Sequence, residues 1–225
     1  MANKDIIVTM TSWKKRLVNV GPVVYSILKN TVQPTKIICN LSTDELPLKE
    51  AELPKDLLLL QKTTCFEVNW VKRNTYTFKK FIPTLQRFYP NDYYMFTIDD
   101  DELYQPTYIE TCINDFQQHQ AVVIAKRNPA STGVWGGMFC CHSSIFKPDY
   151  WNNITEELLG ERMNDPYTNA YLTFYGYKIF NVLEKLTDKY NEIFPNRGNT
   201  GVYTTDKIDR VNKIVANIFA SKFTC

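Results

Sequence analysis

Short apolar segments rich in β-forming residues alternate along the first half of this chain with segments in which apolar residues recur at helical spacing. The β-like segments are residues 5–11, 35–41, 66–71, 92–98 and 120–125. Helical spacing follows Gly21, with Pro22 expected in the first helical turn, and returns at residues 78–85 and after Pro106. This alternation predicts an α/β fold with a mostly parallel central sheet flanked by helices. In such folds ligands bind beyond the carboxyl ends of the strands.

The second half of the chain is less regular. Residues 133–141 resemble a kinked strand, residues 166–175 a short helix, residues 177–183 a strand and residues 206–223 a closing helix. The sequence contains no internal repeat, low-complexity tract or linker composition. We therefore expect residues 1–225 to form a single domain.

Composition excludes several classes of protein. With 44% hydrophobic and 22% charged residues, the chain has the balance of a folded globular protein. A net charge of +2 gives no strong positive field, so no nucleic-acid partner is expected. The six cysteines form no C-x-x-C pair, and the motifs of zinc proteases, serine hydrolases and P-loop enzymes are missing from the sequence. The first residues lack an apolar run of signal-peptide or membrane-span length, which predicts a cytoplasmic location.

An acidic cluster directly follows the fourth β-like segment. Asp99, Asp100, Asp101 and Glu102 succeed an apolar run, and alternation in extended backbone places Asp99 and Asp101 on one side, with Asp100 on the other. Two like charges about 4 Å apart repel by about 1 kcal/mol in water and about 4 kcal/mol at an effective dielectric near 20. A divalent metal removes this repulsion, and Mg²⁺ is typically held by one or two carboxylates together with substrate phosphates. The cluster predicts a metal-diphosphate site; a solvated loop that ends the strand is the alternative interpretation.

Five stretches of the chain form a pattern in this order: residues 9–16 (TMTSWKKR), 77–85 (TFKKFIPTL), 96–104 (FTIDDDELY) and 133–139 (GVWGGMF), with residues 164–179 as a looser member. Together they resemble small bacterial glycosyltransferases of the GT-A fold that have a D-D-D form of the D-x-D motif. The resemblance implies transfer of a sugar from a nucleotide diphospho-sugar, most often a UDP-sugar, with Mn²⁺ or Mg²⁺ as cofactor. The acceptor is expected to be a hydroxyl of a glycan or lipid-linked oligosaccharide, which would attack the sugar with inversion. Residues 1–125 would form the nucleotide-binding half, and residues 126–225 the acceptor-side half.

The same resemblance gives roles to the three aspartates. Asp101 matches the last acid of the motif and should coordinate the metal directly. Asp99 matches the first acid, which approaches the ribose and the water shell of the metal, and so also enters the predicted metal site. Asp100 occupies the variable middle position and is expected to help hold the donor.

The other donor-binding candidates lie in the remaining matched stretches. They are Thr11, Ser12, Trp13, Arg16, Lys80, Gly136 and Gly137. The first three follow the first strand, where the family binds the base and ribose, and Arg16 can meet a phosphate bidentately. Lys80 would counter the phosphate charge, whereas its neighbour Lys79 is expected to be solvated. Gly136 and Gly137 would let the backbone approach the donor or acceptor, with a β-bulge as the alternative interpretation.

An inverting transferase needs a carboxylate that accepts the proton of the acceptor hydroxyl, a contribution of about 10²- to 10⁴-fold in rate. Asp165 is the candidate because it resembles the final acid of the family's acidic doublet, although Asn164 stands where an acid is often found. Asp165 also precedes Pro166, so helix capping is the alternative interpretation. Many relatives supply a late histidine as a metal ligand. Here only His142 could serve, and we interpret it as structural.

The closing helix has an apolar side and several basic residues elsewhere. Core packing is the first interpretation, and a weak contact with the inner face of the membrane is the second. Two other functions remain open for the whole chain. One is a sugar nucleotidyltransferase, although the segment TSWKKR lacks the glycines of its phosphate loop. The other is a non-catalytic carbohydrate-binding protein on the same fold.

Overall fold

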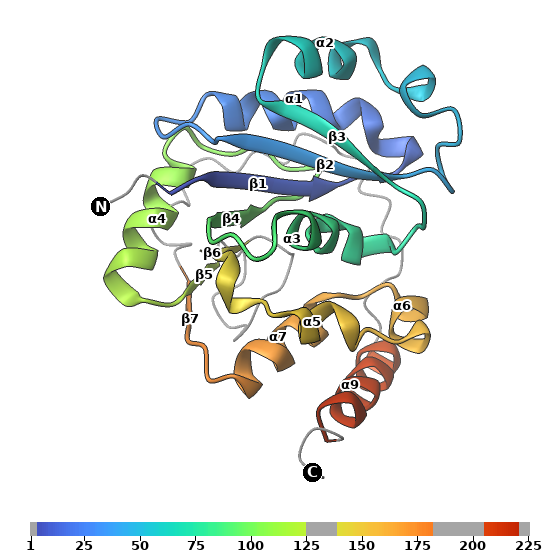
Figure 1. The fold of residues 1–225 in the computed structure, drawn as a ribbon, viewed down its shortest axis with the longest axis vertical. Helices are drawn as coiled ribbons and strands as arrows, with labels where there is room; N and C mark the ends of the chain where they lie inside the picture. The colour runs from blue at the N-terminus through green and yellow to red at the C-terminus, as the bar shows by residue number, and fades with distance from the viewer. Residues whose placement is uncertain (1–3, 125–138, 182–204, 221–225) are drawn as a thin grey trace.

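A computed structural model describes residues 4–124, 139–181 and 205–220 of the chain. Within these ranges, one seven-stranded sheet runs through the molecule in the order β3-β2-β1-β4-β6-β5-β7 (Figure 1). The strands are β1 (Ile6–Thr11), β2 (Lys36–Ser42), β3 (Phe66–Val71), β4 (Tyr94–Thr97), β5 (Val122–Ile124), β6 (Phe139–His142) and β7 (Ile179–Asn181). Among these strands only β6 runs antiparallel to its neighbours, so the predicted mostly parallel α/β sheet is confirmed.

Helices cover both faces of the sheet (Figure 1). They are α1 (Leu17–Leu28), α2 (Lys55–Thr63), α3 (Ile82–Phe88), α4 (Tyr108–His119), α5 (Pro148–Asn152), α6 (Glu156–Glu161), α7 (Asp165–Phe174) and α9 (Thr205–Ala220). Short 3-10 turns are η1 (Lys14–Arg16), η2 (Lys49–Glu52), η3 (Tyr76–Lys80) and η4 (Ser143–Ile145). Buried side chains of α1, α2 and α4 form one core with the sheet, and those of α3, α5, α6, α7 and α9 form a second.

The predicted start of the first helix is wrong. Helix α1 begins at Leu17, so Pro22 lies inside it rather than in its first turn. A proline there removes one hydrogen bond, to the carbonyl of Val18 four residues earlier. Val18 is 68% exposed, so water can reach this part of the helix and compensate for the lost bond.

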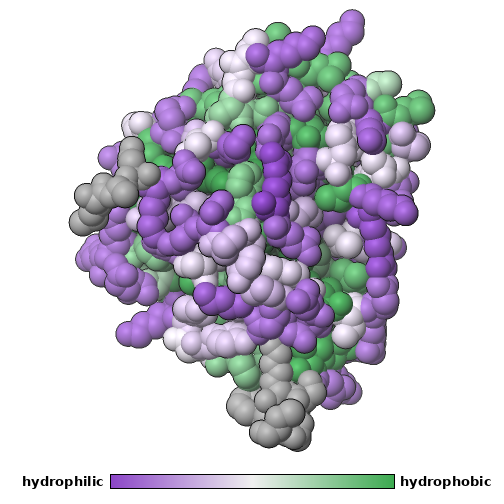
Figure 2. Space-filling view, in the orientation of Figure 1, coloured by the Kyte–Doolittle hydropathy of each residue, from purple (hydrophilic) through white to green (hydrophobic). Residues whose placement is uncertain are grey.

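Helix α9 supports the core-packing interpretation of the closing segment. Its side chains Val211, Val215 and Phe219 are buried, and the helix contacts α6 and α7. Across the described ranges, no helix combines the length and apolarity that a membrane crossing requires. The face of the molecule in Figure 2 is mostly hydrophilic, with hydrophobic residues in scattered patches, as is usual for a surface that contacts water.

Candidate active site

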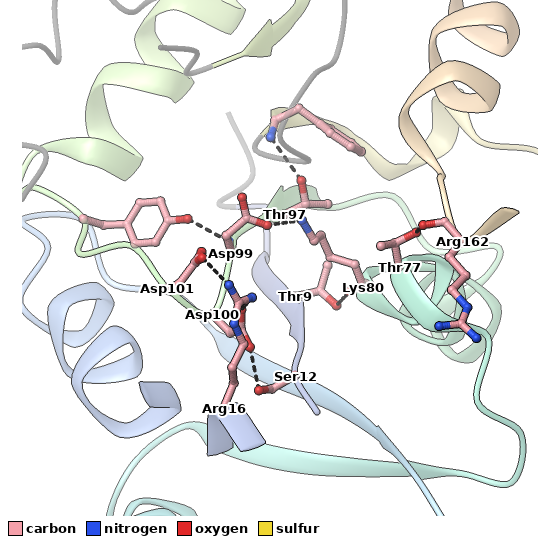
Figure 3. Close-up of polar contacts among 12 residues, drawn as sticks. Thr9, Ser12, Arg16, Thr77, Lys80, Thr97, Asp99, Asp100, Asp101 and Arg162 are labelled. Atoms are coloured by element: carbon pink, nitrogen blue, oxygen red, sulfur yellow. Dashed lines mark hydrogen bonds and ion pairs between the residues drawn. The ribbon is translucent and has the colours of Figure 1, made fainter. Parts of the chain in front are cut away.

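The acidic cluster and the segment after β1 meet at one edge of the sheet. Strands β1 and β4 are parallel neighbours in which Thr9 pairs with Thr97, so their carboxyl ends lie side by side. The segment after β1 contributes Ser12 and Arg16, and the segment after β4 contributes the aspartates (Figure 3). This is the edge at which parallel α/β sheets bind ligands, as the sequence predicts.

One arginine bridges two of the aspartates. Arg16 donates from Nη1 to Asp100 Oδ1 at 2.8 Å and from Nη2 to Asp101 Oδ2 at 2.5 Å (Figure 3). Ser12 Oγ donates to the other oxygen of Asp100 at 2.6 Å. Charge-assisted bonds of this kind are stronger than neutral ones, so Arg16 ties the end of β1 to the end of β4.

The third aspartate has different partners, and the predicted alternation of the cluster is wrong. Asp99 pairs with Lys80 through its carboxylate, and its backbone N–H donates to the Tyr104 hydroxyl at 2.8 Å. Strand β4 ends at Thr97, and Asp100 begins a turn. Because the backbone is no longer extended, side-chain alternation does not apply, and Asp100 and Asp101 share one cation instead.

The position of Lys80 depends on buried hydrogen bonds to η3. Thr9 Oγ1 donates to the Lys80 carbonyl at 2.6 Å, and Asn40 Nδ2 donates to the hydroxyls of Thr9 and Thr84 at 3.1 and 3.0 Å. Asn69 Nδ2 in turn donates to Asn40 Oδ1 at 2.7 Å. The network attaches η3 to β1 and β2 and thereby fixes Lys80 at the site.

Lys80 also links the acidic cluster to Asp165. Burial lowers the pKa of the Lys80 ammonium, but the negative charges of Asp99 and Asp165 and the hydrogen bond to Asp99 outweigh it. The pKa of Lys80 therefore lies above its ordinary value, and the side chain is cationic. Its neighbour Lys79 is buried and donates to Glu45 at 2.6 Å, so the prediction that Lys79 is solvated is wrong.

The carboxyl of Asp100 has a pKa above its ordinary value. Burial raises the pKa of Asp100 to about 6, although Arg16 and the bond from Ser12 act in the opposite direction. The charges of Asp101 and Asp99 raise the pKa further. The positive charge around the cluster therefore does not fully offset the effects of burial and mutual repulsion.

Asp165 begins α7 and is buried, with an exposed fraction of 3%. The N-cap residue of the helix is Asn164, and its side chain makes no capping bond. Asp165 and Pro166 are the first two helical residues, so Asp165 is not the capping residue of the alternative interpretation. Its negative charge acts on Lys80 and raises the pKa of that ammonium.

Two predicted donor-binding residues differ in their surroundings. Thr11 Oγ1 donates to the carbonyl of Asn40 at 2.8 Å, so this hydroxyl already has a backbone partner. Trp13 is 38% exposed, and Lys15 Nζ lies over its ring at 5.5 Å from the ring centroid. The remaining candidates, Gly136 and Gly137, lie outside the described residues.

His142 lies at the end of the β4 and β6 pair that is away from the acidic cluster. It pairs with Tyr94 at the start of β4, and its Nδ1 lies 2.8 Å from Lys4 Nζ and 3.1 Å from Asp92 Oδ2. The aspartate cluster follows the other end of the same strand. The structural interpretation of His142 is therefore confirmed, and it does not complete a ligand set with Asp101.

The carboxylate oxygens of the cluster are suitable ligands for a divalent cation, but within the described residues they do not form a complete coordination site. Within the described ranges, no three side chains of His, Cys, Asp or Glu converge as metal ligands. Asp99, Asp100 and Asp101 nevertheless offer hard oxygen atoms at one edge, and each is bonded here by Arg16 or Lys80. A cation that takes one or two protein carboxylates and completes its shell with phosphate and water needs no larger set.

Sequence reasoning missed the residues that support the site. Tyr104, which accepts the N–H of Asp99, lies within the matched stretch 96–104 but received no role. Asn40 was also overlooked, although an amide inside the apolar segment TKIICNL is a signal of a buried polar network. Both residues act on backbone or buried groups, and such contacts leave no motif.

Comparisons with known proteins identify the type of fold. No protein-family model matches the sequence, and no curated protein sequence does. Among solved structures, S. aureus TarS 1–349 in complex with UDP-GlcNAc has a TM-score of 0.65 at 12% identity, over 95% of this chain and 66% of that one. The mannosyltransferase PcManGT from Pyrobaculum calidifontis, in complex with GDP-Man and Mn²⁺, has a TM-score of 0.59 at 11% identity, over 97% and 70%. The chain has a GT-A-like fold.

A third similar structure broadens the comparison. The 4-diphosphocytidyl-2C-methyl-D-erythritol synthase from Anaerococcus prevotii has a TM-score of 0.51 at 11% identity, over 93% of this chain and 97% of that one. The GT-A-like chain described here spans 65% of TarS 1–349 solved with UDP and 44% of a longer TarS structure. At these identities the likeness concerns the fold.

Proposed function

We propose that this chain is a metal-dependent glycosyltransferase that moves a sugar from a nucleotide diphospho-sugar to a hydroxyl of a glycan or lipid-linked oligosaccharide, with inversion. The observation that carries the proposal is the acidic cluster beside Ser12 and Arg16, at the ligand-binding edge of a GT-A-like sheet. A UDP-sugar is the proposed donor. TarS structures with UDP and UDP-GlcNAc support it. Because PcManGT was solved with GDP-Man, GDP is the nucleotide with which UDP binding should be compared.

At the donor end, Asp99 and Asp101 are the proposed ligands of Mn²⁺ or Mg²⁺. A divalent cation bound there would offset the negative charge of the departing nucleoside diphosphate. The segment after β1, with Thr11, Ser12 and Trp13, is proposed to hold the nucleoside together with Asp100. Gly136 and Gly137 remain proposed donor contacts.

Two cationic side chains are proposed to bind the diphosphate. Arg16 presents a planar fork that suits phosphate oxygens, and Lys80 supplies a compact charge from η3. Both are already at the acidic edge, so neither needs a backbone rearrangement to reach a ligand bound there. Once they contact the diphosphate, such charges would stabilise the leaving group without further reorganisation during the reaction.

At the acceptor end, Asp165 is the proposed base. It lies at the start of α7, where a negative charge is favoured by the helix dipole. Its negative charge and the Lys80 ammonium attract each other, which supports a place for Asp165 near the donor site. Asp165 would take the proton of the acceptor hydroxyl as that oxygen attacks the sugar.

Donor turnover tests this proposal. The purified chain with Mn²⁺ and a UDP-sugar should release UDP by hydrolysis even without an identified acceptor, and Asp101→Asn should abolish the release. Asp92→Asn is the matched control, because it removes an aspartate just before the same strand, at the end away from the site. Wild-type rates in Asp101→Asn would contradict the assignment.

The second candidate is a nucleotidyltransferase. It is favoured by the diphosphocytidyl synthase, because the similarity covers nearly the whole of that chain. Such an enzyme would release pyrophosphate from a nucleoside triphosphate in the presence of a phosphorylated acceptor. Pyrophosphate release without turnover of any nucleotide sugar would favour this function over sugar transfer.

A further inference from the structure

Arg16 occupies the place where one cation can contact two aspartates at once. Its two terminal nitrogens bind different carboxylates, at 2.8 Å on Asp100 and 2.5 Å on Asp101. Figure 3 shows the guanidinium between these side chains, reaching up from the segment after β1. While this contact lasts, Asp101 Oδ2 and Asp100 Oδ1 are engaged by an internal cation.

The bridge is built so that the arginine is its accessible member. The side chains of Asp100 and Asp101 are 7% and 11% exposed, whereas that of Arg16 is 28% exposed. The backbone of Arg16 is anchored, because its N–H donates to the Trp13 carbonyl at 2.8 Å in η1. Rotation of the long side chain can therefore free both carboxylates while the ends of β1 and β4 stay in place.

Release of Arg16 alone is unfavourable, because it leaves two nearly buried carboxylates without their shared cation. Lys80 does not replace it, since its ammonium is paired with Asp99. A divalent cation restores the charge balance at the carboxylates, and an anionic diphosphate nearby gives the released guanidinium a new partner. Release is then favourable only when both components of the donor complex are present.

Resting on the proposed function, we propose that Arg16 is an exchangeable internal counter-ion, which blocks divalent-cation binding until a nucleoside diphosphate arrives and then moves from Asp100 and Asp101 to the diphosphate. Metal binding and nucleotide binding are thereby coupled through one side chain. Such coupling between two ligands is typically about 5- to 150-fold in affinity, and it acts equally in both directions.

The test is Mn²⁺ binding, measured from the paramagnetic resonance of free Mn²⁺ with and without UDP. In the wild-type chain, UDP should tighten Mn²⁺ binding strongly. In Arg16→Gln, Mn²⁺ alone should bind at least about tenfold more tightly than to wild type, and the gain from UDP should shrink by a similar factor. Arg16→Lys should lie between the two, because it keeps the charge but cannot bridge both carboxylates.

Thermal unfolding provides a readout that needs no activity. Without metal, Arg16→Gln should unfold at a lower temperature than wild type, and Mn²⁺ alone should restore more of its stability than it adds to wild type. Arg87→Gln is the matched control, because the exposed Arg87 binds both oxygens of the half-buried Glu67, away from the aspartate cluster. It should leave the Mn²⁺ affinity and its dependence on UDP unchanged.

The outcomes separate this inference from the proposed function. Equal Mn²⁺ affinity of wild type and Arg16→Gln in the absence of UDP would overturn the counter-ion role, even if UDP and Mn²⁺ bind together. Weaker Mn²⁺ binding to Arg16→Gln would overturn it as well. A chain that binds neither Mn²⁺ nor UDP in any variant would overturn the proposed function and this inference together.

Discussion

Lys80, Asp100 and Asp101 are largely removed from water and are paired with opposite charges. Lys80 is 9% exposed and binds Asp99, while Arg16 binds both Asp100 and Asp101. An unpaired charge at such depth would cost several kcal/mol, so the pairing is a condition for the fold. Under the proposed function, a charged donor would have to rearrange these same pairs.

Replacement of Asp165 by Asn should separate binding from catalysis. Asp165→Asn keeps the size of the side chain but removes the proton acceptor, so transfer should fall by about 10²- to 10⁴-fold while UDP binding stays unchanged. Steady-state transfer rates and UDP titrations of the same preparation measure the two effects. Equal losses in both would indicate that Asp165 serves the structure around Lys80 instead.

The pair of Asp92 and His142 predicts a pH dependence of stability. Burial alone would raise the pKa of Asp92, but Lys4 and His142 lower it to about 2, below its ordinary 3.8. The ionised Asp92 therefore stabilises the fold at pH values above 3.8, and this contribution is lost as the pH falls from 3.8 through about 2. Because Asp92 is 36% exposed, the contribution should stay below about 1 kcal/mol.

Urea unfolding of wild type and Asp92→Asn measures this contribution. The free energy of unfolding should be lower in Asp92→Asn at about pH 6, and the difference should narrow towards about pH 3. A difference that is constant over this range would mean that ionisation of Asp92 is not its cause.

The sequence predicted which residues gather at the site better than it predicted their contacts. The acidic cluster follows an apolar segment and could be identified from the printed letters alone. Its partners could not, because the chain turns at Asp100 and the assumed alternation fails there. Lys79 and Lys80 are adjacent and chemically alike, and only the fold shows that Lys79 binds Glu45 while Lys80 reaches Asp99.

At the level of elements, the site depends on how η3 is attached to the sheet. Thr9 and Asn40, on β1 and β2, hold the last carbonyl of η3 and thus the Lys80 side chain. Phe78 of the same turn is fully buried in the core that α3, α5, α6, α7 and α9 form. The hydrogen bonds therefore link the stability of the sheet to the geometry of the site.

Asn40→Ala should disturb both the stability of the sheet and the geometry of the site. It removes the partner of Thr9, Thr84 and Asn69, and unsatisfied buried groups cost about 1–3 kcal/mol, so the free energy of unfolding should fall by that order. Thr43→Ala, which removes an exposed side-chain bond just after β2, is the control and should change stability by less than about 0.5 kcal/mol. Equal effects of the two substitutions in urea unfolding would contradict this role for Asn40.

Helices and strands could be predicted from the sequence where apolar residues recur at a regular spacing without interruption. The strands of the first half were recognised to within about two residues at most ends, as is usual for such boundaries. Helices α2, α5 and α6 were not predicted, because α5 and α6 have only 5 and 6 residues and α2 carries a polar and apolar mixture. The start of α1 was predicted too late, next to Pro22, because a proline is more common in the first helical turn than inside a helix.

For the whole molecule, the sheet brings distant parts of the chain to one edge. The segment after β1, the end of η3, the turn after β4 and the start of α7 are far apart in sequence, yet their charges act on one another. The parallel order of β1 and β4 makes this possible, because it places their carboxyl ends together. The central claim, proposed above, is that this edge of a GT-A-like fold binds an anionic donor together with a divalent cation.

Calorimetric titration of UDP tests that claim most directly, with wild type and Asp101→Asn each measured with and without Mn²⁺. We predict that UDP binds wild type, that Mn²⁺ tightens this binding strongly, and that Asp101→Asn loses the Mn²⁺-dependent part. UDP binding that is indifferent to both Mn²⁺ and Asp101, or no binding of UDP or GDP under any of these conditions, would contradict the account.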